Sequence, residues 1–345
     1  MKKMPEKEIT VLFIWKVRDE LREYLKKGLK EFSNVKLIFP EEAENDIYLK
    51  HAPNVDVIVG WRPAEELLQT AQNLKLYLNP GVGVQHLIEL FKKVNETRNI
   101  TLCNGHGNTY FTAQHAVALL LALTNKLIPH HNWMVKGEWR KGDADARSTP
   151  LRTREVGLLG YGAINTKLHK FLSGFDVNFH ILKRDWDRKR VESFPTPVKK
   201  YSQTELHKFM ENIDILFVSI PLTSQTNGLI TKKELELLGP DGLLVTVARG
   251  EVIDEESLYN ALKNKTITGA AIDVWYNYRP EPDNEGRKYP ANFPFHELDN
   301  VILSPHRGAS PMNDLKRWDE VIENISRFVR GESNFLNVVN LENEY

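Results

Sequence analysis

The chain has almost no cysteine. Its 345 residues include a single one, Cys103, so no intrachain disulfide can form. This usage is typical of a reducing compartment, and a lone cysteine without a motif is expected to be a buried small apolar residue. Charge bias is absent too, because 46 basic residues balance 46 acidic ones. The overall charge therefore predicts neither a nucleic acid nor an anionic membrane as partner.

Long apolar runs are also absent. The longest, "AVALLLAL" at 116–123, is far shorter than the roughly 20 residues of a membrane-spanning helix. The opening "MKKMPEKEIT" does not have the pattern of a signal peptide. We therefore expect a cytoplasmic protein that does not contact a membrane. What the chain does have is 41% apolar and 27% charged residues, a globular composition over a length that suits two domains.

Short apolar runs rich in β-branched residues alternate with amphipathic helices twice along the chain. The first series covers about residues 8–105 and the second about 155–306. Between them, residues 112–139 are predicted to form a long apolar helix that breaks near Pro129. A last amphipathic helix is expected over 314–331. Alternation of this kind predicts two doubly wound α/β domains, each with a parallel sheet covered on both faces.

A glycine turn opens the second series. In "EVGLLGYGAIN" an apolar strand meets Gly160 and Gly162, and a helical pattern follows. The first glycine permits a tight turn, and the second lets a pyrophosphate approach the backbone at the helix N-terminus. The dinucleotide fingerprint has a third glycine three residues later, where this chain has Asn165. The motif alone is compatible with a nucleotide site or with an ordinary strand-to-helix turn.

The next strand bears on which nicotinamide cofactor would bind. It ends in Lys183 and Arg184, where an acidic residue would bind the ribose 2′-hydroxyl of NAD. Two cations at this position can pair with a 2′-phosphate, which favours NADP(H) over NAD(H). Asp185 could still serve a ribose if the strand ends later, and a solvated basic strand end is the plain alternative.

Two further residues follow apolar strands of the second series. Arg249 comes after "LLVTVA" and His306 after "VILSP". The carboxyl ends of parallel strands are where open α/β sheets bind ligands. An arginine there can hold a carboxylate in a bidentate fork, and a histidine can move a proton to or from a carbonyl oxygen. Each residue alone is more often structural than functional.

Several motifs occur together in a fixed order, namely "GLLGYGAIN", "PLTSQTNGLI", "LLVTVARGEVID", "GAAIDVW" and "NVILSPHRG". Together they resemble the D-isomer-specific 2-hydroxyacid dehydrogenase family, over about residues 50–340. "LNPGVGVQHL" at 78–87 resembles the glycine-rich substrate loop of this family. The resemblance implies a flavodoxin-like substrate domain of residues 1–106 and 307–345, and a Rossmann cofactor domain of residues 107–306.

The resemblance also implies roles for individual residues. Arg249 would bind the substrate carboxylate and carbonyl, and His306 would be the acid/base. The backbone N–H groups of Val82 and Gly83 would hold the substrate carboxylate. Lys183 stands where the family usually has the aspartate that selects NAD. The remaining cofactor positions are Ala163 and Ile164 at the pyrophosphate turn, Pro221 and Thr226 in the cofactor wall, and Val247 and Asp273 near the nicotinamide carboxamide.

The catalytic carboxylate is the clearest departure from the family pattern. The family places it a few residues after "DV[FW]", often just before a proline. Here the first acid is Glu281, which precedes Pro282 but lies eight residues after Asp273. About three residues earlier, at the usual spacing, the chain has Tyr278. Either the loop carries an insertion and Glu281 is the acid, or the acid is missing. We favour Glu281, with Glu285 as a more distant candidate.

The function that the resemblance implies is reduction of a small 2-keto acid to the D-2-hydroxy acid with NAD(P)H, in a cleft between the domains. No metal is expected. A homodimer is expected through the long helix after residue 112, together with Trp133 and Trp139. The alternatives are oxidation of formate or phosphite, and a cofactor-sensing binding protein or corepressor of the same fold.

Overall fold

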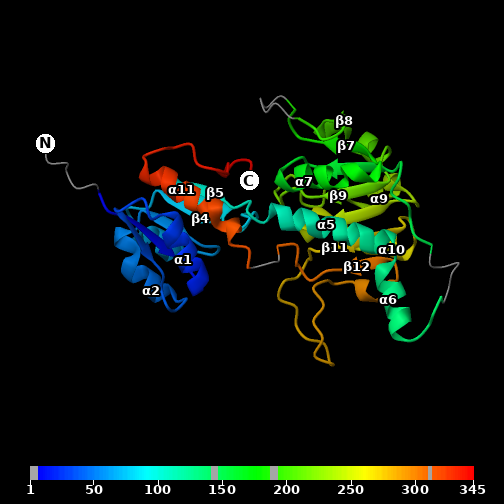
Figure 1. The fold of residues 1–345 in the computed structure, drawn as a ribbon, viewed down its shortest axis with the longest axis horizontal. Coiled ribbons are helices and arrows are strands. Elements are labelled where there is room, and N and C mark those ends of the chain that lie inside the picture. Colours follow the sequence, from blue (N-terminus) through cyan, green and yellow to red (C-terminus); the bar gives the residue numbers. More distant parts are fainter. Residues whose placement is uncertain (1–6, 141–146, 187–192, 310–312) are drawn as a thin grey trace. The chain divides into compact units, whose positions relative to one another are not determined.

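The structure, a computed structural model, describes residues 7–140, 147–186, 193–309 and 313–345. The chain divides into two compact units, Met1–Asn108 with Pro311–Tyr345 (unit 1) and Thr109–Ser310 (unit 2). These divisions lie two and four residues beyond the predicted ones, after residues 106 and 306. Each unit holds its own parallel sheet between helices (Figure 1). The predicted fold class, two doubly wound α/β domains, is confirmed.

Unit 1 has a five-stranded parallel sheet in the order β2-β1-β3-β4-β5, the flavodoxin-like arrangement. Its strands are β1 (Ile9–Phe13), β2 (Val35–Ile38), β3 (Val57–Val59), β4 (Leu76–Asn79) and β5 (Thr101–Asn104). Its helices are α1 (Asp19–Gly28), α2 (Asn45–His51), α3 (Glu65–Thr70), α4 (Ile88–Asn95) and α11 (Asp319–Val329). Side chains of alternate strand residues form two apolar clusters, one with α1 and α11 and the other with α2 to α4.

Unit 2 has a seven-stranded parallel sheet in the order β12-β11-β10-β9-β6-β7-β8, which is the Rossmann arrangement. Its strands are β6 (Glu155–Leu159), β7 (Asn178–Leu182), β8 (Val198–Tyr201), β9 (Ile215–Val218), β10 (Leu243–Thr246), β11 (Gly269–Ile272) and β12 (Val301–Leu303). Its helices are α5 (Thr109–Thr124), α6 (Leu127–Val135), α7 (Ala163–Leu172), α8 (Leu206–Met210), α9 (Lys232–Leu238) and α10 (Glu255–Lys263). Helices α5 and α7 cover one face, and α8 to α10 cover the other (Figure 1).

Two local expectations need correction. The long apolar helix breaks at Lys126, whose φ of 51° is left-handed, and not at Pro129. Pro129 lies in the first turn of α6, where its missing N–H removes no hydrogen bond. Strand β8 was not predicted, because its sequence "VKKY" is short and polar. Within the described ranges it pairs with β7 alone, at the end of the sheet order, and two exposed lysines there suit an edge strand.

Two features of the sequence can be placed on this fold. Cys103 is buried in unit 1, and burial raises the pKa of its thiol to about 12. The expectation of a small core residue is therefore confirmed. Among the described residues, no single helix has the length and apolar content to cross a membrane. Helices α5 and α6 reach that length and composition only as a pair, and the pair bends by 64°.

Candidate active site

Most of the predicted site residues lie along one edge of the unit 2 sheet. All neighbouring strands run parallel, so their carboxyl ends meet at the same edge. Gly160, Lys183, Asp273 and the loop with His306 follow four of these strands directly or within a few residues, and Arg249 follows a fifth. Strand order reverses between β6 and β9, which is the switch point where such sheets bind ligands.

The glycine turn has the geometry that a dinucleotide requires. Gly160 has a φ of +81°, and a Cβ there would lie 2.6 Å from Cγ2 of Ile220. A side chain at this position would therefore be strained and crowded. Gly162 is the N-cap of α7, and a Cβ built on it meets no atom within 4 Å. No side chain caps this helix, so its first N–H groups, at Ala163 and Ile164, remain for a ligand to bind.

Asn165 does more than replace a glycine. Its side chain is fully buried, and its amide donates to the carbonyl oxygens of Leu159 at 3.1 Å and Gly160 at 2.7 Å. In the structure the amide ties α7 to the end of β6 and to the turn itself. Asparagine thus stabilises this turn with hydrogen bonds, where the fingerprint glycine allows close packing.

A histidine beneath the turn was not predicted. His169 on α7 is fully buried, and its Nδ1 lies 2.9 Å from the hydroxyl of Tyr161, the residue between the two glycines. Its Nε2 lies 2.8 Å from Oγ1 of Thr196. Burial lowers the pKa of His169 to about 4, so the ring is neutral at physiological pH. The helical pattern of α7 placed His169 inward, but nothing in the sequence pairs it with Tyr161.

Cations gather at the end of β7, where the ribose specificity was predicted. Lys183 directly follows the strand, and its Nζ lies 5.3 Å from the ring centre of Trp186. Nζ of Lys200, on the neighbouring β8, lies 4.7 Å from the same ring. Arg184 is exposed. Lys183 and Lys200 thus lie against one indole ring, and with the adjacent Arg184 they offer positive charge at this strand end.

The cofactor wall and the strand ends contain polar groups that fit a ligand. Thr226 is turned inward, and its Oγ1 donates to the carbonyl oxygen of Pro221 at 2.7 Å and so shapes the loop. Within the described residues, the buried hydroxyls of Ser219 and Thr246 have no hydrogen-bond partner. They stand at the ends of the adjacent strands β9 and β10. Buried polar atoms are normally paired, so these hydroxyls and the open turn at Gly162 fit a nicotinamide dinucleotide.

His306 has a strained backbone and an unexpected partner. Its φ of 54° is left-handed, a conformation that residues with side chains seldom adopt outside functional sites. Nδ1 of its ring lies 2.6 Å from the hydroxyl oxygen of Tyr278. Glu281, which we favoured as the acid, is exposed, as is Glu285. The structure therefore brings Tyr278, and neither of these glutamates, to His306.

Asp273 holds the loop that carries His306. It is buried, and Oδ1 accepts hydrogen bonds from Oγ of Ser304 at 2.5 Å and from the N–H of Arg307 at 2.7 Å. Oδ2 accepts from the N–H of Gly308 at 2.9 Å. Burial opposes the charge of this carboxylate, but the hydrogen bonds from His115, Ser304 and the loop lower its pKa. Asp273 thus has a structural role beside the predicted one near the carboxamide.

Arg249 lies three residues beyond β10 and completes this edge of the sheet. The side chain is half-buried, and Nη1 donates to the carbonyl oxygen of Ala248 at 2.7 Å. The pKa of His306 is lowered by desolvation first, then by the positive charge of Arg249, with Arg307 adding to it and Asp273 opposing it. Electrostatics therefore couple the predicted arginine and histidine. Val247, which directly follows β10, is a buried core residue.

Comparison with known proteins agrees with this arrangement. Residues 117–308 match the family model "D-isomer specific 2-hydroxyacid dehydrogenase, NAD binding domain". A glyoxylate reductase from Thermofilum pendens is 30% identical over 272 residues, which cover 77% of this chain and 75% of that protein. The chain belongs to the D-isomer-specific 2-hydroxyacid dehydrogenase family. It is therefore an oxidoreductase that uses a nicotinamide cofactor, as the motifs implied.

Other relatives differ in their named activity. A D-3-phosphoglycerate dehydrogenase from Archaeoglobus fulgidus is 30% identical over 71% of this chain but only 43% of its own length. A mitochondrial formate dehydrogenase from Solanum tuberosum is 27% identical over 88% of this chain and 79% of its own. The fold matches an NADPH-dependent glyoxylate/hydroxypyruvate reductase from Sinorhizobium meliloti, in complex with NADP and malonate, with a TM-score of 0.74, 24% identity and 98% coverage of both chains.

In unit 1 of this dehydrogenase, side-chain amides shape the predicted substrate loop. Asn79 donates to the carbonyl oxygens of Gly81 at 2.5 Å and Gly83 at 3.3 Å. Asn104 donates to the carbonyl oxygen of Val82 at 2.7 Å. The loop carbonyls are thus occupied, whereas the N–H groups of Val82 and Gly83 have no acceptor in the described part of the chain. Sequence reasoning missed both asparagines, although each ends a predicted strand beside this loop.

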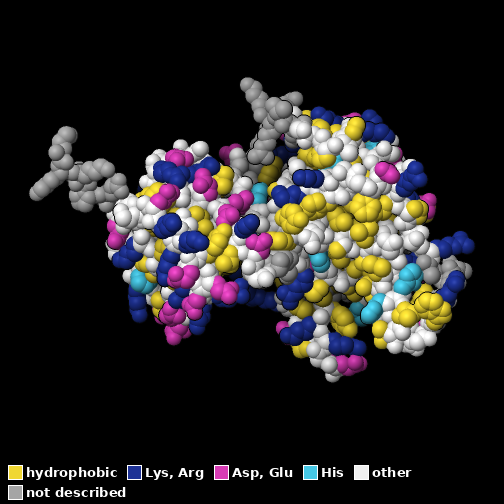
Figure 2. Space-filling view, in the orientation of Figure 1, with side chains coloured by type: hydrophobic (Ala, Val, Ile, Leu, Met, Phe, Trp, Pro, Cys, Tyr) yellow, Lys and Arg dark blue, Asp and Glu magenta, His cyan; other side chains and the backbone are white. Residues whose placement is uncertain are grey.

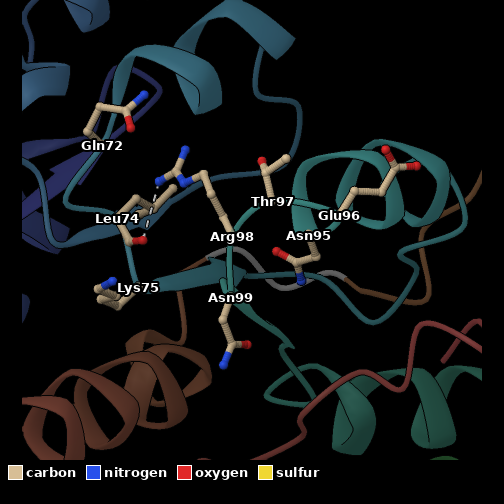
Figure 3. Close-up of a pocket in the computed structure, with 8 residues that line it drawn as sticks. All are labelled: Gln72, Leu74, Lys75, Asn95, Glu96, Thr97, Arg98 and Asn99. Carbon is tan, nitrogen blue, oxygen red and sulfur yellow. Dashed lines mark hydrogen bonds between the residues drawn. The ribbon is translucent and has the colours of Figure 1, made fainter.

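A groove at the opposite edge of the unit 1 sheet is structural. Gln72, Leu74, Lys75 and residues 95–99 line it, just before β4 and β5 begin (Figure 3). Arg98 donates to the carbonyl oxygens of Leu68 and Ala71, both at 2.5 Å, and of Leu74 at 3.4 Å. Its guanidinium thereby satisfies the end of α3. The described residues contain no cluster of three metal-ligating side chains either.

Proposed function

We propose that this chain reduces a small 2-keto acid to the D-2-hydroxy acid. The observation that carries the proposal is the placement of Arg249 after β10 and His306 after β12, at one edge of a Rossmann sheet in a chain of this family. The charge of Arg249 acts on the pKa of His306. A guanidinium and an imidazole are the two groups that a 2-keto acid needs, because it presents one carboxylate and one carbonyl oxygen.

Each residue then has a defined task. A bound reduced nicotinamide would supply hydride to the carbonyl carbon. Arg249 holds the substrate carboxylate in a bidentate fork, and the N–H groups of Val82 and Gly83 are a second proposed carboxylate ligand. His306 donates the proton from Nε2 to the carbonyl oxygen. Gly162 and the first N–H groups of α7 bind the pyrophosphate, and Ser219 and Thr246 offer hydroxyls to the rest of the cofactor.

NADPH is the proposed cofactor in preference to NADH. Support comes from Lys183 and Arg184, which replace the acidic residue expected for NAD, and from Lys200 beside them. Positive charge attracts a 2′-phosphate, and the loss of the acid removes a repulsive charge. Two solved structures with this fold were obtained with NADP, one from Sinorhizobium meliloti and one from Rhizobium etli.

A homodimer is the proposed assembly. Helix α6 has no buried residue, and Figure 2 shows hydrophobic side chains grouped at its surface. The exposed apolar residues there are Leu127, Ile128, Met134 and Val135, followed by Trp139, which is 75% exposed. Exposed apolar side chains in such a group favour a protein interface over solvent. A second copy of this chain covering α6 would remove them from water.

Formate oxidation is the second candidate. Formate dehydrogenases from Solanum tuberosum, Pseudomonas and Arabidopsis thaliana are among the relatives, at 26% to 28% identity. Loss of hydride from formate gives carbon dioxide and requires no proton acceptor. In the described residues Nδ1 of His306 contacts the hydroxyl of Tyr278 and no carboxylate. This arrangement suits formate oxidation, because that reaction does not need an imidazolium stabilised by a neighbouring anion.

A turnover assay separates these functions. Purified protein should oxidise NADPH, or NADH more slowly, with at least one of glyoxylate, hydroxypyruvate, pyruvate or a branched 2-keto acid. Arg249→Ala should abolish turnover with little change in NADPH affinity, and Arg152→Ala, at an exposed arginine before β6, is the matched control. Reduction of NAD⁺ or NADP⁺ by formate, without turnover of any keto acid, would establish the second candidate. Cofactor binding without any turnover would favour the sensing protein.

A further inference from the structure

Three tyrosine hydroxyls in the described part of unit 2 contact Nδ1 of a histidine. The pairs are Tyr161–His169 and Tyr201–His180, both at 2.9 Å, and Tyr278–His306 at 2.6 Å. In the first two pairs the histidine is fully buried. In the third the histidine is exposed and the tyrosine is 53% exposed, at the carboxyl edge of the sheet. Only this pair combines the hydrogen bond with access for a ligand.

The hydrogen bonds around Tyr278 fix the direction of its hydroxyl. The backbone N–H of Trp275 lies 3.3 Å from the tyrosine oxygen and can only donate to it. The hydroxyl hydrogen is therefore directed to Nδ1 of His306, because no other acceptor for it is present among the described residues. A neutral imidazole that accepts at Nδ1 carries its own hydrogen on Nε2. Nε2 is then the donor for a substrate oxygen.

We propose that Tyr278 is the positioning and proton-relay partner of His306: its hydroxyl holds the Nε2–H tautomer and gives its proton to Nδ1 as Nε2 gives up its own. The role rests on the proposed keto acid reduction. It assigns to a phenol the place that the sequence led us to expect for Glu281, and it leaves Glu281 without a part in the proton transfer.

The loop that carries Tyr278 is pinned on both sides. The indole nitrogen of Trp275 donates to the carbonyl oxygen of Ser304 at 2.8 Å, which ties the start of the loop to the His306 segment. The N–H groups of Tyr276 and Asn277 donate to the carbonyl oxygen of Pro290 at 3.2 and 2.9 Å. Asp273 holds the other side of the His306 segment. Tyrosine and histidine are thus presented by two segments that share hydrogen bonds.

The charged groups around the pair disfavour an imidazolium. Desolvation and the cations Arg249 and Arg307 lower the pKa of His306, and among the described residues the anion that opposes them is Asp273. The carboxylate of Asp273 is occupied by its own four donors, so it cannot also bind the ring. For Tyr278, desolvation raises the pKa, the hydrogen bond from Trp275 and the charge of Arg249 lower it, and Glu251 and Asp273 raise it. At neutral pH the pair is therefore a neutral imidazole beside a neutral phenol.

A neutral pair can complete the reduction only as a relay. The carbonyl carbon gains a hydride, and its oxygen gains the Nε2 proton of His306. The ring would become an imidazolate if Nδ1 did not take the hydroxyl proton of Tyr278 in the same step. The Trp275 N–H and the charge of Arg249 favour the resulting tyrosinate. Nε2 of His306 then takes a proton from water, and Nδ1 returns its proton to the tyrosinate, which restores the Nε2–H tautomer. One hydride and one proton have then reached the substrate, and the protein returns to its starting state.

The test compares Tyr278→Phe and Tyr278→Glu with wild type, and Tyr289→Phe is the control. Tyr289 stacks on exposed His296 at 3.8 Å and lies outside the site. Long-range ¹H–¹⁵N spectra of the histidine rings, with His306→Gln for assignment, need no substrate or cofactor. In wild type His306 should be the Nε2–H tautomer. In Tyr278→Phe the Nε2–H tautomer should no longer be preferred. In Tyr278→Glu the His306 ring should be an imidazolium at neutral pH, because a neighbouring carboxylate stabilises the charged form.

Rates of keto acid reduction against pH supply the second measurement. Wild type should keep kcat/KM level through neutral and mildly alkaline pH. Tyr278→Phe should lose about tenfold or more of kcat with KM nearly unchanged. Its kcat/KM should fall as rising pH removes the proton from His306, because without the phenol the reaction must use the imidazolium as proton donor. The kcat/KM of Tyr278→Glu should fall at a pH about one unit or more higher than that of Tyr278→Phe, because the carboxylate stabilises the imidazolium.

Several results would overturn the proposal. An Nδ1–H tautomer in wild type, or identical spectra of wild type and Tyr278→Phe, would remove its structural basis. Identical pH profiles of these two proteins would remove the relay even if the enzyme is active. If wild type reduces no keto acid, the relay falls with the proposed function, while the spectra still decide the tautomer. An equal loss in Tyr289→Phe would show a general effect of loop substitutions.

Discussion

Acidification should weaken unit 2 through one buried ring. His169 lies under the cofactor turn, and its Nδ1 and Nε2 contact the hydroxyls of Tyr161 and Thr196. Burial lowers its pKa from 6.5 to about 4. The unfolded chain therefore takes up a proton at a pH where the folded chain does not. The folded state loses stability as pH falls below 6.5, and the loss is complete below about pH 4.

The size of this effect follows from the two pKa values. A difference of about 2.5 units, from 6.5 to about 4, corresponds to about 3 kcal/mol in the limit of low pH. Between about pH 7 and about pH 4.5, a single such group lowers the free energy of unfolding by about 2 kcal/mol. His169 is fully buried, so solvent does not screen this contribution. The stability of unit 2 is compared at the two pH values by urea unfolding.

The histidine must be separated from the carboxylates that titrate in the same range. His169→Gln keeps polar atoms toward Tyr161 and Thr196 but cannot take up a proton. Its loss of stability between the two pH values should be about 2 kcal/mol smaller than that of wild type. His296→Gln, at an exposed ring, should follow wild type. Equal pH dependence of wild type and His169→Gln, or a ring that titrates near 6.5 in NMR spectra, would refute the reasoning.

Three further predictions concern the cofactor turn, its specificity and the assembly. Lys183→Asp should move the ratio of kcat/KM for NADPH to that for NADH by about tenfold or more toward NADH, because it replaces an attractive charge with a repulsive one; an unchanged ratio would contradict the assignment. Asn165→Ala removes two buried hydrogen bonds and should cost about 1–3 kcal/mol in urea unfolding and weaken NADPH binding in calorimetry; wild-type values would show that the bridge is dispensable. Val135→Glu puts a charge on the exposed apolar surface of α6 and should shift a homodimer toward monomer in sedimentation, whereas a monomeric wild type would refute the dimer.

The sequence was sufficient for the fold because its signals are periodic and repeated. Runs such as Leu243–Thr246, buried at every position, predict strands of a parallel sheet, and these strands were found with ends shifted by a few residues. The exceptions have local causes. Strand β8 is an edge strand with two exposed lysines, so it lacks the apolar run that marks the others. The break after α5 depends on the left-handed backbone of Lys126, a conformation that a lysine in the sequence does not predict.

The site was predictable only where a residue follows its own strand. Gly160, Arg249 and His306 lie at strand ends, so the parallel topology alone brings them to one edge of the sheet. His169 and Thr196 could not be found in this way, because one lies within a helix and the other in an irregular segment before β8. Asn79 and Asn104 are at strand ends as well, but their task is to bind loop carbonyls, and no spacing rule identifies that task.

The choice between Glu281 and Tyr278 shows what decides such a case. A rule based on residue type searches the loop for an acid and finds Glu281, whereas the backbone decides which side chain reaches the ring. The loop is anchored at Trp275 by hydrogen bonds to Ser304 and Tyr278, so a residue three positions later faces His306. Glu281 lies three positions further on and is exposed. If Tyr278 is the relay, proton transfer to the substrate is retained, with the phenol in place of a carboxylate as the partner of His306. The ring can then remain neutral, whereas a carboxylate would stabilise its charged form.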